Sequence, residues 1–134
     1  MDINLKQKSA IIDLTKRFDF KLLLLFGSRS SGYAREDSDY DLAYLSSRDL
    51  SFQDENLINS RFCDILMTYN VDTVNLKTAG PLLLKQILDN NKIIYEETSL
   101  YFSNFEVLVL QKYREAKPLF DIRHEHIKNF IYDR

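Results

Sequence analysis

The sequence predicts a single α/β domain, and three observations lead to this fold class. Apolar residues recur at helical spacing in some segments, whereas other segments are short, apolar and rich in β-branched residues. The two kinds of segment alternate along 134 residues, with no internal repeat and no linker-like tract. A chain of this length suits one domain with one continuous core. We therefore expect residues 1–134 to fold as one unit.

The first half of the chain predicts two helices and two strands. Apolar residues at helical spacing predict a helix over residues 3–17, followed by a buried strand, Phe20–Phe26. Gly27 and Ser28 end this strand, and a short helical turn through Ser31 precedes a second strand, Asp39–Ser46. Residues 46–55 are polar and predict a loop. The next apolar set predicts a helix that contains Leu57, Ile58, Phe62, Ile65 and Leu66.

The second half predicts two more strands and two more helices. Val71–Leu76 is rich in β-branched residues and predicts a strand. Pro81 suits the first turn of a helix that continues through Leu88 and ends at Asn90-Asn91. A short strand is expected over residues 92–96, and a long helix from Ser99 onward. Pro118 should kink or break that helix.

Composition narrows the class of protein. Eighteen basic and 20 acidic residues give a net charge of −2, which does not favour a general nucleic-acid-binding surface. Cys63 is the single cysteine, so an intramolecular disulfide is excluded; we expect it to be a small buried apolar residue. The longest apolar run is too short to span a membrane, and no signal-like segment opens the chain. We expect a soluble, cytoplasmic protein.

The motif with the clearest chemistry is an acid pair that follows a glycine-serine turn. Asp39 and Asp41 lie two residues apart on a predicted strand and so project from one face, whereas Tyr40 and Leu42 point the other way. Two adjacent carboxylates repel each other unless a cation lies between them. Oxygen ligands without histidine or cysteine favour Mg²⁺ or Mn²⁺. Solvated acids on a surface turn are the alternative.

A magnesium ion held by few carboxylates keeps positions that substrate phosphates can fill. Gly27 lets the backbone approach closely, and Ser28 opens a helical turn whose N–H groups and hydroxyl can hold an anion. Arg29, with Arg35 as a secondary candidate, can add charged contacts to the same phosphates, although solvated loop arginines are as common.

A third carboxylate would complete the metal site. Asp72 is the main candidate because it lies near the start of a strand expected to neighbour the acid pair. An exposed acid at a strand start is the alternative. Asp64, on a predicted helix, is a weaker rival.

The spacing of Gly27-Ser28 and Asp39-Tyr40-Asp41 resembles the signature of the polymerase-β-like nucleotidyltransferases. The wider text, from "LFGSRSSG" through "VDTVNL" to "KIIYE", is similar to the minimal nucleotidyltransferase (MNT) group over about residues 10–97. The resemblance implies a small mixed β-sheet flanked by helices, with residues 98–134 as a C-terminal helical segment. Many relatives carry a further aspartate where this chain has Asn75.

The resemblance also implies a function. Asp39 and Asp41 match the two strand acids of the family, Asp72 the third acid and Ser28 the phosphate-binding serine, which implies transfer of a nucleotide with two Mg²⁺ ions. Antitoxins of the MntA type, encoded beside a HEPN-type toxin called HepT, transfer AMP from ATP to a toxin tyrosine. We therefore expect a protein adenylyltransferase with ATP as substrate, a HepT-like partner and no stable nucleic-acid or membrane binding.

Two other functions remain open at this point. One is transfer of a nucleotide to a small molecule such as an antibiotic hydroxyl, and the other is a module that blocks a toxin by contact alone. The C-terminal third is rich in aromatic residues, and residues 119–132 could dock on a partner. His124 and His126 face away from each other on a predicted helix and are expected at the surface.

Overall fold

The computed structural model describes residues 3–27 and 39–132. Ser28, Arg29 and Arg35, which carry the predicted phosphate contacts, lie outside the described residues, as does the helical turn predicted through Ser31. The elements, in chain order, are α1 (Leu5–Arg17), β1 (Phe20–Phe26), β2 (Tyr40–Ser46), α3 (Phe52–Leu66), β3 (Val71–Asn75), α4 (Pro81–Asp89), β4 (Asn91–Glu96) and α5 (Ser99–Tyr132).

The strands form one mixed sheet in the order β3-β2-β1-β4. The strand β1 pairs antiparallel with both β2 and β4, whereas β2 and β3 run parallel. The parallel pair needs a crossover, and α3 provides it between β2 and β3. The expected mixed sheet flanked by helices is therefore confirmed.

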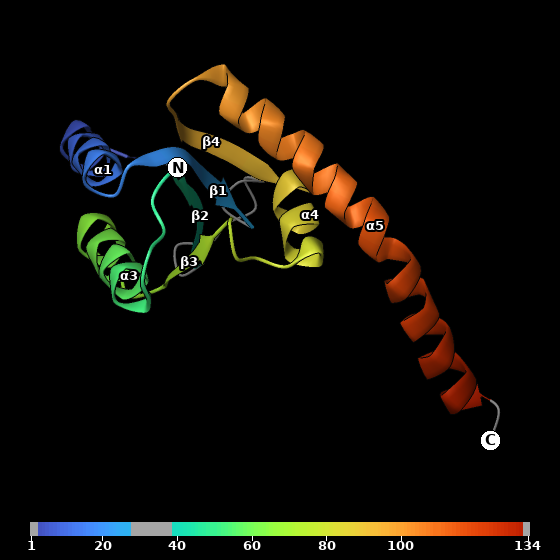
Figure 1. The fold of residues 1–134 in the computed structure, drawn as a ribbon. Coiled ribbons are helices and arrows are strands. Elements are labelled where there is room, and N and C mark those ends of the chain that lie inside the picture. Colours follow the sequence, from blue (N-terminus) through green and yellow to red (C-terminus); the bar gives the residue numbers. More distant parts are fainter. Residues whose placement is uncertain (1–2, 28–38, 133–134) are drawn as a thin grey trace.

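Helices cover both faces of this sheet (Figure 1). Alternation along β1 sends Leu23 and Leu25 toward α1 and α3, and Leu22 and Leu24 toward α4 and α5. All four leucines are fully buried. Burial of β1 on both faces explains why its sequence is uniformly apolar rather than alternating.

The helix α3 begins earlier than the sequence predicted. Residues 46–55 were expected to form a loop, but the helix begins at Phe52, with Ser51 as its N-cap. The Ser51 hydroxyl accepts from the backbone N–H of Asp54, and the Asp54 carboxylate accepts from the N–H of Ser51. This reciprocal cap satisfies two backbone donors, so the polar first turn of α3 is stable as helix.

The long helix α5 continues through Pro118, so the proline does not break it, and the kink predicted as the alternative stays a prediction. A proline lacks the N–H that would bond to the carbonyl of Arg114, but both residues are exposed there, so water can bond to that carbonyl. The first half of α5 packs on the sheet through Phe105 and Val109. Its distal half extends beyond the rest of the domain (Figure 1).

The structure also bears on the predictions made for Cys63 and for a membrane-spanning segment. Cys63 is half-buried rather than buried, and its Sγ lies 3.8 Å from Oδ1 of Asn59. The helix position of Cys63 places it at the margin of the core that α1 and α3 share. Across residues 3–27 and 39–132, no helix combines the length and the apolar character that a membrane crossing requires.

Candidate functional site

Two of the predicted acids lie side by side on neighbouring strands. Asp41 of β2 and Asp72 of β3 are partners in the parallel register. Leu42 and Val71 point into the core beneath α1 and α3, so Asp41 and Asp72 project from the opposite face. The sheet therefore brings together two carboxylates that are 31 positions apart in sequence.

Gly27 lies directly against Asp41. It follows β1, whose last residue, Phe26, is the register partner of Asp41. Its φ of +75° favours glycine, and a Cβ added there would collide with Oδ2 of Asp41 and lie 3.2 Å from its Cγ. The Gly27 carbonyl also accepts a bond of 3.3 Å from the Asn90 side chain at the end of α4. The missing side chain is what lets the turn and the carboxylate share this space.

The environment of Asp41 disfavours its negative charge. Partial burial raises the pKa of the Asp41 carboxyl, and the charges of Asp72 and Asp39 raise it further. An uncompensated carboxylate at this position therefore destabilises the fold. A cation bound between the acids would remove the repulsion and lower the pKa of Asp41 again.

The donor set fits magnesium, although the acids do not form a closed cage. Asp39, exposed just before β2, Asp41 and Asp72 offer oxygen ligands. In the described part of the chain, no group of three His, Cys, Asp or Glu side chains converges as a ready metal site. Magnesium commonly takes one or two carboxylates together with substrate phosphates rather than an all-protein cage.

The other candidate residues lie elsewhere. Asp64 is exposed on α3, beside a hollow that α1 and α3 form on the opposite side of the sheet from Asp41. His124 and His126 are exposed on the distal part of α5. None of these three side chains is brought to the acid pair.

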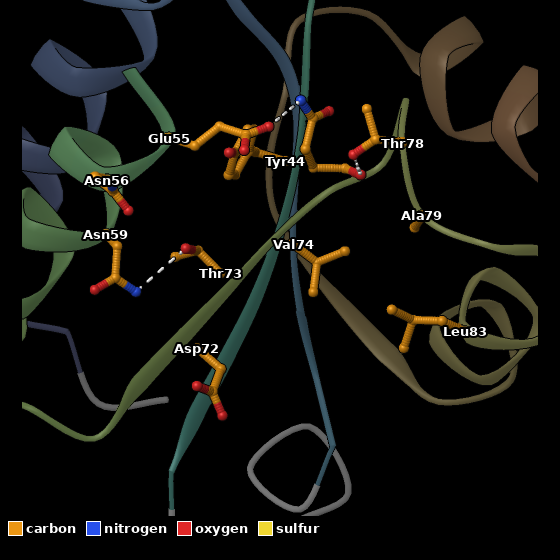
Figure 2. Close-up of a pocket in the computed structure, with 11 residues that line it drawn as sticks. Tyr44, Glu55, Asn56, Asn59, Asp72, Thr73, Val74, Thr78, Ala79 and Leu83 are labelled. Atoms are coloured by element: carbon orange, nitrogen blue, oxygen red, sulfur yellow. Dashed lines mark hydrogen bonds between the residues drawn. The ribbon is translucent and has the colours of Figure 1, made fainter. Parts of the chain in front are cut away.

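The structure also contains a pocket of about 400 Å³ beside β3, which sequence reasoning did not identify (Figure 2). Asp72 lies at one end and Glu55 and Thr78 at the other. The side-chain nitrogen of Asn59 donates to the Val71 carbonyl at 2.9 Å and to Oγ1 of Thr73 at 3.2 Å. Its lining residues come from β2, α3, β3 and the start of α4, so no continuous sequence pattern predicts the pocket. Glu55 also lies in the stretch that was predicted to be a loop.

Comparison with known proteins agrees with this geometry. Residues 9–99 match the family model described as polymerase beta, nucleotidyltransferase. The protein adenylyltransferase MntA of Aphanizomenon flos-aquae (strain 2012/KM1/D3) is 31% identical over 127 residues, which cover 88% of this chain and 85% of the relative.

Solved structures share the fold. One chain of a toxin–antitoxin crystal structure with AMP-PNP superposes with a TM-score of 0.80 at 24% identity, covering 90% of this chain and 98% of that chain. A structure of a tri-AMPylated Shewanella oneidensis HEPN toxin in complex with an MNT antitoxin gives a TM-score of 0.75 at 22% identity, covering 92% and 97%.

Proposed function

Because the chain belongs to the polymerase β nucleotidyltransferase family, we propose that it is an antitoxin that transfers AMP from ATP to a protein hydroxyl. The acceptor is a tyrosine of a cognate HEPN-type toxin, with which the chain forms a hetero-oligomer in the cytoplasm. Transfer of AMP neutralises the toxin. The name of the MntA relative and the toxin–antitoxin structures with the same fold support this assignment.

One observation carries the proposal. Asp41 and Asp72 are register partners on parallel strands, and the Gly27 turn lies against Asp41. Burial, and then repulsion by Asp72 and Asp39, raise the pKa of the Asp41 carboxyl. Repulsion of this kind is retained at functional sites when a bound cation or substrate relieves it.

The residues of the chain have distinct roles in the proposed reaction. Asp39, Asp41 and Asp72 would hold two Mg²⁺ ions, which supply charge neutralisation at the phosphates and a lower pKa for the attacking hydroxyl. Gly27, Ser28 and Arg29 bind the β- and γ-phosphates through backbone N–H groups, a hydroxyl and a guanidinium. Asp41 and Asp72 would position the α-phosphate for in-line attack through the ions that they hold, so positioning accounts for most of the acceleration and no covalent enzyme intermediate is needed.

The test is adenylyl transfer to the partner. The purified protein is incubated with ATP, Mg²⁺ and the HEPN-type protein encoded beside it, and the intact mass of the partner is followed with time. Wild-type protein should add AMP, whereas Asp41→Asn and Asp72→Asn should be slower by at least about a hundredfold.

Asp64→Asn is the matched control, because Asp64 is an exposed aspartate on the other side of the sheet and should leave the rate unchanged. Equal rates for all four proteins would contradict the proposed site. Neutralisation of the toxin by wild-type protein without any mass change would instead support a module that acts by contact alone.

A further inference from the structure

The pocket beside β3 shares only Asp72 with the residues proposed to bind magnesium and the phosphates. We propose, on the basis of the function above, that this pocket receives the acceptor side chain, a neutral aromatic hydroxyl carried by the partner protein. Asp72, one of the two neighbouring strand acids, forms one end of the pocket (Figure 2). An acceptor in this pocket would present its hydroxyl beside Asp72.

The order of groups across the sheet supports this assignment. Gly27 follows β1, Asp41 lies on β2, Asp72 lies on β3, and the pocket lies beyond β3, which is an edge strand. In an in-line displacement the attacking and leaving oxygens lie on opposite sides of the phosphorus. If the β- and γ-phosphates lie at the Gly27 turn, the attacking hydroxyl must approach from the side of β3.

The charge of the pocket argues for a neutral occupant. Glu55 and Asp72 are acidic, and the described residues that line the pocket include no lysine or arginine. Phosphates would be repelled from such a surface. A phenol carries no charge at neutral pH and can donate a hydrogen bond to a carboxylate.

The lining also suits a side chain that is apolar except at its tip. Val74, Ala79 and Leu83 offer apolar contact for a ring, and asparagine and threonine side chains offer hydrogen bonds. The walls are fixed in advance, because Nδ2 of Asn75 donates to Oε1 of Glu55 at 2.9 Å and Asn59 is bonded to β3. Fixed walls reduce the entropy lost when the acceptor binds.

Transfer needs no reactant other than ATP and the acceptor. The acceptor oxygen forms a bond to the α-phosphorus, and the bond from that phosphorus to the oxygen bridging to the β-phosphate breaks. Pyrophosphate leaves with the electron pair of that bond, and the hydroxyl proton passes to water.

A large side chain placed in the pocket should weaken binding of the acceptor protein without weakening binding of ATP. Asn56 is exposed on α3 and lines the pocket, whereas Gln53 is exposed on the same helix and does not. We would measure KM for the HEPN-type acceptor protein and KM for ATP with Asn56→Trp, with Gln53→Trp as control. Thr78→Trp, on the opposite wall, is a second variant should Asn56→Trp fold poorly.

The inference predicts that both pocket variants raise KM for the acceptor protein by at least about tenfold. Their KM for ATP should stay within about twofold of wild type, and Gln53→Trp should match wild type in both values. A raised KM for ATP with an unchanged KM for the acceptor would place the nucleotide in the pocket and overturn the inference. Unchanged values for both would also overturn it.

The same measurements show whether the pocket assignment or the proposed function is wrong. If wild type and Gln53→Trp transfer AMP and the pocket variants match them, only the pocket assignment is wrong. If wild-type protein transfers no AMP to the acceptor, the proposed function fails and the pocket assignment fails with it.

Discussion

At the scale of single residues, Gly27 ties the backbone turn to the chemistry of the acid pair. Its positive φ and its contact with the Asp41 carboxylate both require the absence of a side chain. The same position is therefore constrained by backbone conformation and by the site, and a change there should affect both stability and nucleotide binding.

Gly27→Ala should lower the free energy of unfolding by about 1–2 kcal/mol from the strained φ alone, and its methyl group should displace Asp41. We expect weaker binding of Mg²⁺-ATP, measured by calorimetry, together with a lower urea midpoint. Gly80→Ala is the control, because an added Cβ at Gly80 meets nothing within 4 Å. If both alanine variants behaved alike, the contact between Gly27 and Asp41 would not matter for binding.

At the scale of elements, a cluster of polar side chains stabilises the turn between α1 and β1. Asp19 adopts φ 53° and accepts hydrogen bonds from Nζ of Lys21 and from the Ser47 hydroxyl. Lys21 also pairs with Glu97 beyond β4 at 2.7 Å. These bonds therefore tie β1, β2 and β4 together at one end of the sheet.

Asp19→Asn gives a test through pH. Hydrogen bonds from Ser47 and Lys21 lower the pKa of the Asp19 carboxyl below its ordinary value of 3.8. A lowered pKa adds stability above the unfolded-state pKa, and that stability is lost as the pH falls through the folded-state pKa. Asparagine tolerates the positive φ. The stability advantage of wild type over Asp19→Asn should thus be full at neutral pH and disappear in acid.

Urea unfolding of both proteins across the pH range measures this difference. In a Lys21→Met background the advantage at neutral pH should be smaller, because one of the two hydrogen bonds to Asp19 is missing. A difference that did not change with pH would contradict a role for the carboxylate charge.

Elements with a simple apolar pattern could be predicted from sequence. Phe20–Phe26 was predicted with its observed bounds, because burial on both faces leaves an uninterrupted apolar run. The first turn of α3 was missed because its stability comes from the Ser51 and Asp54 cap rather than from apolar spacing. The neighbouring positions of Asp41 and Asp72 were expected from the motif and its family resemblance. The pocket was not expected, since it depends on how α3, β3 and the start of α4 meet.

At the scale of the whole molecule, the distal part of α5 is an unpartnered extension. Leu119, Ile122 and Ile127 are more than half exposed, at 68%, 55% and 53%. The core clusters include no residue of α5 beyond Val109, among the described part of the chain. The fold should therefore not depend on this extension, and we propose that residues 119–132 contact the toxin.

Truncation after Lys117 should change the free energy of unfolding by no more than about 0.5 kcal/mol, as for other changes outside the core. Affinity for the HEPN-type partner, measured by calorimetry, should fall, because exposed apolar side chains at the interface are lost. Full affinity of the truncated protein would rule out docking through residues 119–132.

Calorimetric titration of AMP-PNP into the protein, with Mg²⁺ and with EDTA, tests whether the strand acids form a magnesium site. We predict that wild type and Asp64→Asn bind AMP-PNP when Mg²⁺ is present and lose most of that affinity in EDTA. Asp41→Asn and Asp72→Asn should bind weakly under both conditions. Equal binding by wild type with and without Mg²⁺, or an equal loss in Asp64→Asn, would contradict a magnesium site formed by neighbouring strand acids.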